Sequence, residues 1–180
     1  MSLSDTKKLS NPASRLVASA LIACLLGGHA AAAQRAAVFE FEIIQGSVVP
    51  GAPDHHEAEE QRLHMISERL RDHLVKSGKF ELADVTPVAE KAAASNLQAC
   101  GNCADGFAHE VGATYAFTGT VHKVSELLLS INVYVHEAVT SKPATSASVD
   151  VRVNTDESWR RGIDYLHKNV LSPRLEKLLK

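Results

Sequence analysis

The second half of the chain restricts the fold most, because apolar and polar residues alternate strictly there. Residues 115–124, 127–136 and 147–153 each repeat this pattern with a period of two, which is typical of strands with one buried face. In the last segment, alanine or valine stands at every odd position, and residues 140–143 supply the turn before it. We therefore expect three long strands in a meander, which must bury its apolar face against another layer.

The first half of the domain predicts strands separated by helices. Residues 38–44 place Phe39, Phe41 and Ile43 on one face of a strand, and residues 45–56 hold the glycines and prolines of a loop. Residues 57–76 then carry leucine and isoleucine at helical spacing opposite a charged face, with Gly78 as the stop. Phe80 and Leu82 make a short strand.

Helix signals complete the pattern. Thr86 is expected to cap an alanine-rich helix that has Pro87 in its first turn and ends near Asn96. A short helix around residues 107–111 precedes Gly112, and a closing amphipathic helix runs from Asp156 to a stop at residues 172–173. The order β-α-β-α-α-β-β-β-α predicts an α/β (α+β) fold, a mixed β-sheet with helices packed on at least one face.

The first 33 residues have the features of a signal peptide. Three basic residues precede an apolar run over residues 16–26, and small residues at 30–33 offer a cleavage site before Gln34. The apolar run has about 12 residues, too few for a bilayer span of roughly 20. We predict a periplasmic domain over residues 34–180, without a transmembrane helix.

A lipid anchor is the alternative way of leaving the cytoplasm. Leu21-Ile22-Ala23-Cys24 resembles the lipobox of bacterial lipoproteins, in which the cysteine is lipidated and becomes the new N-terminus. Cys24 is therefore a candidate lipidation site. Both processing routes place the protein in the cell envelope.

Export changes the meaning of the two remaining cysteines. Cys100 and Cys103 form a Cys-Gly-Asn-Cys sequence, and in an oxidising compartment such a pair is expected to form a disulfide. The closed loop is very short, so the bond should add little stability. The alternatives are a redox-active pair and a metal site completed by His109. No helix with an obvious thiolate-stabilising residue is expected directly after the pair, which argues against the redox role.

A histidine-rich segment gives a candidate metal site. His55, His56, Glu60 and His64 fall within one loop and the start of the following helix, and these are metal-ligand types. A solvated loop explains the same residues, because acids near a helix N-terminus are also favoured by the helix dipole.

The polar positions of the strands give a candidate binding surface. If the apolar residues are buried, a set of polar residues projects from the opposite sheet face: Glu40, Glu42, His122, Asn132, His136, Asp150 and Arg152. Residues 154–159 are explained by capping and by Trp159 in the core, which leaves Arg152 and Arg160 without a structural role. The candidate binding residues are His122, His136, Asp150, Arg152 and Arg160. A solvated polar face is the alternative.

Composition excludes several function classes. A formal net charge of -2 over 180 residues lacks the basic surface that nucleic-acid binding needs. With 45% hydrophobic residues, the chain is not disordered. No serine nucleophile elbow, phosphate loop or HExxH sequence is present, so we predict no catalytic residue and no cofactor.

Two resemblances extend this interpretation. Phe39-Glu40-Phe41, Gly78-Lys79-Phe80 and Gly119-Thr120-Val121 lie in an arrangement that resembles the amino-terminal domain of TolB and the CsgG-type envelope proteins. The cysteine pair and the stretch Arg152-x-Asn154-Thr155-Asp156-Glu157-Ser158-Trp159 are similar to an exported bacterial family of unknown function. Neither resemblance transfers a catalytic residue.

The resemblance to TolB and the CsgG-type proteins implies a function through protein contacts at the envelope. We therefore expect a non-enzymatic accessory protein that binds an unknown envelope protein. The alternative is a periplasmic redox or metal-handling protein centred on Cys100 and Cys103.

Overall fold

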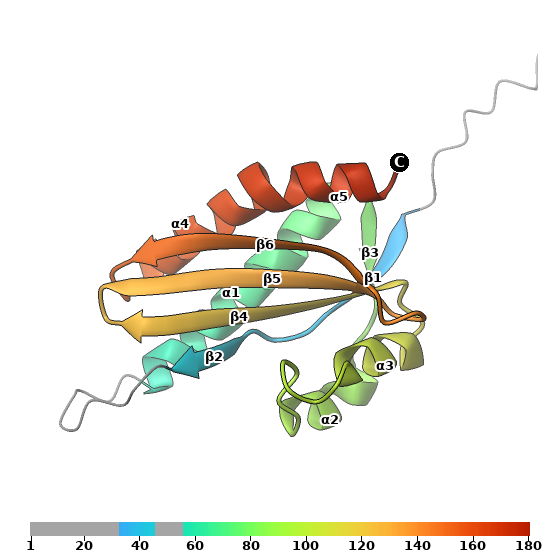
Figure 1. Cartoon of the computed structure of the whole chain (residues 1–180), viewed down its shortest axis with the longest axis horizontal. Coiled ribbons are helices and arrows are strands. Elements are labelled where there is room, and N and C mark those ends of the chain that lie inside the picture. The colour runs from blue at the N-terminus through green and yellow to red at the C-terminus, as the bar shows by residue number, and fades with distance from the viewer. Residues whose placement is uncertain (1–32, 46–55) are drawn as a thin grey trace, which may run out of the picture. The chain divides into compact units, whose positions relative to one another are not determined.

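A computed structural model describes residues 33–45 and 56–180 (Figure 1). Apart from Ala33, the predicted signal peptide lies outside the described residues, as do Cys24 and His55. Within the described ranges, no helix is both long enough and apolar enough to cross a membrane.

Six strands form one mixed sheet. They are β1 (Gln34–Val38), β2 (Glu42–Gln45), β3 (Phe80–Leu82), β4 (Tyr115–Ser125), β5 (Leu128–Glu137) and β6 (Pro143–Arg152). The order across the sheet is β3-β1-β4-β5-β6, and β2 also pairs with β4. Pairing is parallel for β1 with β3 and for β1 and β2 with β4, and antiparallel through β4, β5 and β6. The predicted mixed sheet and its C-terminal meander are confirmed.

Helices cover both faces of the sheet. They are α1 (His56–Lys76), a 3-10 turn (Thr86–Val88), α2 (Ala89–Ala93), α3 (Cys103–Glu110), α4 (Asp156–Tyr165), a π-helical segment (Leu166–Leu171) and α5 (Ser172–Leu178). The larger core joins the sheet to α1 and α4, with Leu70 and Trp159 fully buried in it. A smaller core of mostly small residues, including Ala104 and Ala108, lies under α3 on the other face. In Figure 1, α2 and α3 lie near one end of the long strands.

The strand predicted over residues 38–44 is in fact two strands joined by a bulge. Val38 pairs with Phe117, and Glu42 pairs with Thr120. Three residues, 39–41, therefore lie opposite only two residues of β4. An extra residue of this kind reverses the face on which later side chains lie.

The bulge separates Phe39 from Phe41 and Ile43, which were predicted to share one face with it. Phe39 lies in the smaller core, with its ring centroid 6.5 Å from that of Phe107. Phe41 lies in the larger core, where its ring covers Gly119. The two rings therefore occupy opposite faces of the sheet, rather than the single face that a continuous strand would give them.

Two other element boundaries differ from the prediction. Thr86 is not an N-cap, because its backbone N–H donates to Oδ1 of Asp84 at 2.9 Å and the α-helix begins only at Ala89. β6 begins at Pro143, where its pairing with β5 starts, and ends before Val153. Val153 adopts a positive φ of 69° and is exposed, so it does not continue the predicted inward row.

The closing helix continues past its predicted end at residues 172–173. Pro173 lacks an N–H and its ring crowds the carbonyl four residues earlier, which normally ends an α-helix. Here the π-helical segment Leu166–Leu171 precedes Pro173. Its backbone hydrogen bonds join residues five apart, so they already replace the bonds between residues four apart that the proline would break. The chain therefore continues as α5 to Leu178.

Candidate functional site

One face of the β4–β6 meander is left without a covering helix over most of its length. The odd-numbered residues of β5 and β6, such as Ile131 and Val151, are buried against α1 and α4. The even-numbered residues therefore lie on the other face. We call this surface the open face, and it consists of His122, Leu128, Ser130, Asn132, Tyr134, Ser146, Ser148, Asp150 and Arg152.

Hydrogen bonds across the strands organise the middle of the open face. The hydroxyl of Ser148 donates to Oδ1 of Asn132 at 2.6 Å, and Nδ2 of Asn132 lies 3.3 Å from Oγ1 of Thr120. These contacts fix the amide of Asn132 between two neighbouring strands. The centre of the surface is therefore preorganised.

The open face brings together three of the five predicted binding residues. His122 and Asp150 both pair with Ser130 across the ladders, and Arg152 lies two residues further along β6. Within the described ranges, none of these three side chains has a hydrogen-bond or ion-pair partner. They are exposed polar groups that remain available to another molecule.

Exposed apolar side chains cluster at the turn between β4 and β5. Leu128 on the open face is 41% exposed, and Val124 and Leu127 in the hairpin are 60% and 68% exposed. Val153 approaches the same turn, because its N–H donates to the carbonyl of Leu127. Exposed apolar residues that cluster in this way are characteristic of interaction surfaces.

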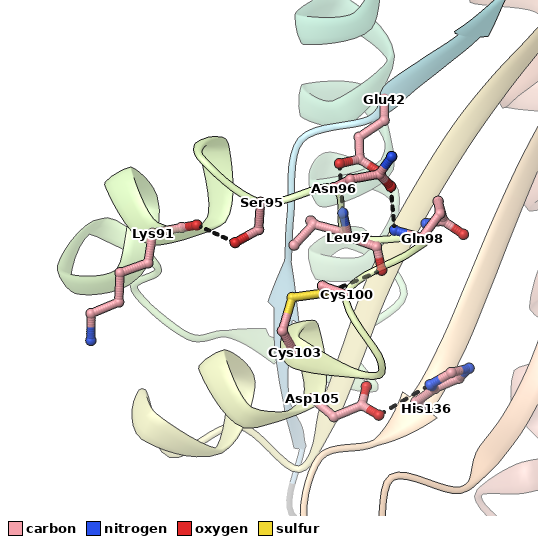
Figure 2. Close-up of a disulfide and its surroundings, with 10 residues drawn as sticks. All are labelled: Glu42, Lys91, Ser95, Asn96, Leu97, Gln98, Cys100, Cys103, Asp105 and His136. Carbon is pink, nitrogen blue, oxygen red and sulfur yellow. Dashed lines mark hydrogen bonds and ion pairs between the residues drawn. A yellow bond between two sulfur atoms is a disulfide. The ribbon is translucent and has the colours of Figure 1, made fainter.

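A pocket of about 330 Å³ lies at the opposite end of the open face. It is formed between the disulfide loop, the start of α3 and the sheet (Figure 2). Its lining residues are Leu97, Gln98, Ala99, Gly101, Asn102, Ala104, Asp105, Ala116, Thr118, Tyr134 and His136. His136, the fourth predicted binding residue, therefore lines the pocket.

The pocket contains a buried carboxylate. The side chain of Asp105 is only 2% exposed, and its Oδ2 lies 3.2 Å from Nδ1 of His136 (Figure 2). Asp105 belongs to the first turn of α3, where the helix dipole favours a negative charge. Sequence reasoning did not identify Asp105, because only the folding of α3 against β5 brings it to His136.

The predicted bond between Cys100 and Cys103 is present, and it shapes the pocket wall. The two Cα atoms lie 5.6 Å apart. Just before the bridge, the backbone N–H of Leu97 donates to Oε1 of Glu42 at 2.8 Å, which ties the loop to β2 (Figure 2). Glu42 thus points to the same side of the sheet as Thr120, with which it pairs, as predicted, but its carboxylate positions the loop instead of remaining exposed.

The short helix predicted around residues 107–111 starts earlier than expected, directly at the cysteine pair. α3 begins at Cys103 itself, after Gly101 and Asn102 have both taken left-handed conformations with φ of 69° and 68°. These two residues turn the chain directly from the bridge into the helix. His109 is the histidine that was suggested to complete a metal site with the two cysteines. It lies six residues further along α3, which is about 9 Å along the helix axis from Cys103 at a rise of 1.5 Å per residue.

The predicted metal ligands do not converge. His56 lies 3.2 Å from Glu60 on the first turns of α1, whereas His64 faces Glu40 at 3.5 Å. These pairs are separate, so the predicted set forms no common site among the described residues.

A different trio of metal-capable residues lies close together in the described part of the chain. It consists of Glu40, His64 and Glu68, all exposed. Nη1 of Arg71 lies 2.8 Å from Glu40 and 2.6 Å from Glu68. A protein cation therefore already bridges the two acids.

Arg160, the fifth predicted binding residue, is separate from the open face. It extends from α4, the helix that packs on the opposite side of the sheet, and forms an ion pair with Glu157. Its Nη1 also lies 3.9 Å from Asp164. Arg160 therefore takes part in a helix-surface charge network.

Comparison with known sequences identifies a family. Residues 34–171, more than half of the chain, match the profile of DUF3280, which is described as "Protein of unknown function (DUF2380)". No curated protein matches the chain.

Several solved structures are similar in fold. The LpoB C-terminal domain from Salmonella enterica has 18% identity and a TM-score of 0.45, and the match covers 66% of this chain and 82% of that one. Lipoprotein GNA1162 from Neisseria meningitidis has 12% identity over 79% and 99% of the two chains, with a TM-score of 0.48. TolB from Acinetobacter baumannii has 13% identity over 82% and 28%, with a TM-score of 0.42. No residue role is transferred from them.

Proposed function

We propose that this chain, which belongs to the DUF3280 family, is a non-enzymatic protein of the bacterial cell envelope that binds another protein on its open face. The observation that carries the proposal is the layout of this face. Exposed Leu128 and its apolar neighbours lie at one end, and a polar pocket with a buried carboxylate lies at the other. Protein interfaces combine apolar contacts with polar groups of this kind.

The middle of the open face also favours docking over simple solvation. Ser146, Ser148 and Asn132 carry short side chains, and two of them are already held by a hydrogen bond. Short side chains lose less rotamer entropy on burial than lysine, arginine or glutamate. A partner could therefore cover this surface at a low entropic cost.

The pocket supports recognition better than catalysis. His136 contacts Asp105, but within the described residues no hydroxyl forms a hydrogen bond with the His136 ring. A histidine that activates a nucleophile would be within hydrogen-bond reach of one. Among the described residues the His136 ring therefore makes no hydrogen bond with a nucleophile, which favours a binding role for the pocket.

The disulfide supports an envelope location. Such bonds persist in oxidising compartments and are rare in the cytoplasm. The bond between Cys100 and Cys103 thus agrees with the export that the first 33 residues predict.

Site-specific photo-crosslinking in intact cells tests the proposal. A photoreactive residue at Ser148 should give one defined crosslinked product, whereas the same residue at Asp72, on exposed α1 surface, should give none. Leu128→Glu should abolish the product, because it places a charge in the apolar end of the interface. Val139→Glu is the matched control, since Val139 is 74% exposed but lies outside the open face. Equal products from both positions, or none from Ser148, would contradict the proposal.

A redox role for the cysteine pair is the second candidate function. It is favoured by one observation: α3 begins at Cys103, where the positive end of the helix dipole would stabilise a thiolate. Equilibration with glutathione buffers separates the two functions. A redox-active pair should exchange at the potential of the compartment, whereas a structural bond should stay oxidised.

A further inference from the structure

We infer that the pocket beside the disulfide loop binds a cationic group, an ammonium or guanidinium, that the docked protein presents on a lysine or arginine side chain. This inference rests on the proposed function, since it names the chemistry of the partner at one end of the open face. It is argued from the charge, burial and size of the pocket.

The first argument is the charge of the pocket lining. Asp105 is the one carboxylate among the lining residues, and no lysine or arginine is among them. The other titratable groups of the lining are the imidazole of His136 and the phenol of Tyr134. An anionic ligand would therefore meet a negative charge with no cationic side chain to balance it.

The second argument is that Asp105 is incompletely compensated. Its side chain is 2% exposed, and its one hydrogen bond with a side chain in the described structure is the 3.2 Å contact with His136. Charge-assisted hydrogen bonds are usually about 2.7–2.9 Å long. Because a buried carboxylate is stabilised by further charged partners, a cation in the pocket would add to the contact with His136.

The third argument is the supply of further acceptors. The hydroxyls of Thr118 and Tyr134 and the side-chain amides of Gln98 and Asn102 belong to residues that line the same space. Their oxygens can accept the several N–H groups of an ammonium or guanidinium. The ring of Tyr134 also offers a face on which a cation can lie.

The size of the pocket fits a side chain. Its volume of about 330 Å³ is near the lower limit of about 300 Å³ for small-molecule sites. It opens at the end of the surface on which a partner would dock, since Tyr134 belongs both to its lining and to the open face. A lysine or arginine from the docked protein could therefore enter it.

Titration with small probes tests the inference on the full domain in its oxidised form. The probes are the Nα-acetyl amides of lysine, arginine and norleucine, followed by NMR of the amide groups around the pocket. We expect saturable shifts with at least one basic probe and none with norleucine amide, which has a similar aliphatic chain but no charge. Asp105→Asn should weaken this binding at least tenfold.

Two control variants keep the result interpretable. Asp72→Asn removes an exposed carboxylate of α1, outside both the pocket and the open face, and should leave probe binding unchanged. Tyr134→Phe keeps Asp105 and should reduce binding by a smaller factor, so the inference remains testable if Asp105→Asn fails to fold. Equal binding of the lysine and norleucine amides, or unchanged binding in Asp105→Asn, would overturn the inference.

The inference and the proposed function can fail separately. Loss of cation selectivity with the Ser148 crosslink retained overturns this inference and leaves the proposed function standing. Selective probe binding without a crosslink overturns the proposed function, together with the assignment of the cation to a docked protein.

Discussion

The indole Nε1 of Trp159 donates a 2.9 Å hydrogen bond to Oδ1 of Asn154, and the indole is completely buried. Nδ2 of Asn154 in turn donates to Oε1 of Glu59 at 2.7 Å and to Oε2 of Glu126 at 2.9 Å. One amide side chain therefore joins α4, α1 and the β4–β5 turn. The spacing of Asn154 and Trp159 in the sequence thus has a structural role.

Asn154→Ala should strongly destabilise the domain. The substitution removes the amide that accepts a hydrogen bond from the Trp159 indole and donates one to the buried Glu59 carboxylate. Because both groups are buried, we expect the free energy of unfolding to fall by about 3 kcal/mol. Urea unfolding measures this loss. Asn132→Ala, which removes an amide bonded to hydroxyls on the open face, should cost less than about 1 kcal/mol. Equal losses in the two variants would refute the role of Asn154.

Gly119→Ala should destabilise the domain through a clash. A Cβ at this position would overlap the ring of Phe41, which is held in the larger core, and overpacking of this kind typically costs about 1–3 kcal/mol. Gly106→Ala in α3 is the control, because a Cβ there has no neighbour within 4 Å and alanine favours a helix. Thermal unfolding should therefore show a lower Tm only for Gly119→Ala.

Removal of the disulfide should cost little stability. The bond joins residues three apart in sequence, and loop-closure entropy for so short a loop is worth at most about 2 kcal/mol. The Cys100→Ser/Cys103→Ser variant should therefore unfold at a slightly lower urea concentration than the oxidised protein. Its unfolding should be unaffected by a reductant, whereas reduction should bring the wild-type curve to that of the variant. A variant that cannot fold would show that the bond does more than fix a local turn.

Acidification should weaken the domain partly through His167. Its ring stacks on His73 with centroids 4.5 Å apart, and His73 and Arg69 both bond to Asp164. Burial, and then repulsion from His73, lowers the pKa of His167 from 6.5 to about 4, although Asp164 opposes the shift. Between pH 6.5 and 4, the unfolded chain therefore binds more protons at His167 than the folded chain does. The folded state thus keeps its full stability from this group above pH 6.5 and loses it as the pH falls towards 4.

His167→Phe tests this assignment, because phenylalanine keeps an aromatic ring that cannot be protonated. Unfolding free energies measured by urea from pH 7.5 to 4 should show a shallower pH dependence in the variant than in the wild type. Asp164 contributes at lower pH, since its pKa lies below the ordinary value of 3.8: burial raises it, but the hydrogen bonds from Arg69 and His73 outweigh burial. Parallel pH profiles for the two proteins would show that another group carries the effect.

The fold was largely predictable, and the failures have a common cause. Local periodicity placed α1, β3, β4, β5 and the start of α4 close to their observed bounds. It failed at residues 39–41, where the pairing of β1 and β2 with β4 introduces a bulge. It failed again after Leu171, where a π-helical segment lets the helix continue past Pro173. Both deviations depend on what neighbouring segments do, which no local pattern contains.

The candidate site was predictable only in part. Alternation correctly put His122, Asp150 and Arg152 on one face, because side chains in a strand point to alternate sides. Arg160 was wrongly grouped with them, since nothing in the sequence states on which side of the sheet α4 packs. Asp105 carried no recognisable signal, because its importance comes from a contact with His136, which is 31 residues away.

The sequence by itself determined the class of fold, the cysteine pair that forms the bond and the polar face of the meander. These features follow from residue spacing and from the chemistry of single residues, which act over a few positions of the chain. Only the tertiary structure decided that α3 covers one end of that face and leaves the rest open. Such an arrangement is set by the packing of two apolar cores on opposite sides of one sheet, and it makes a pocket from segments that the sequence keeps apart.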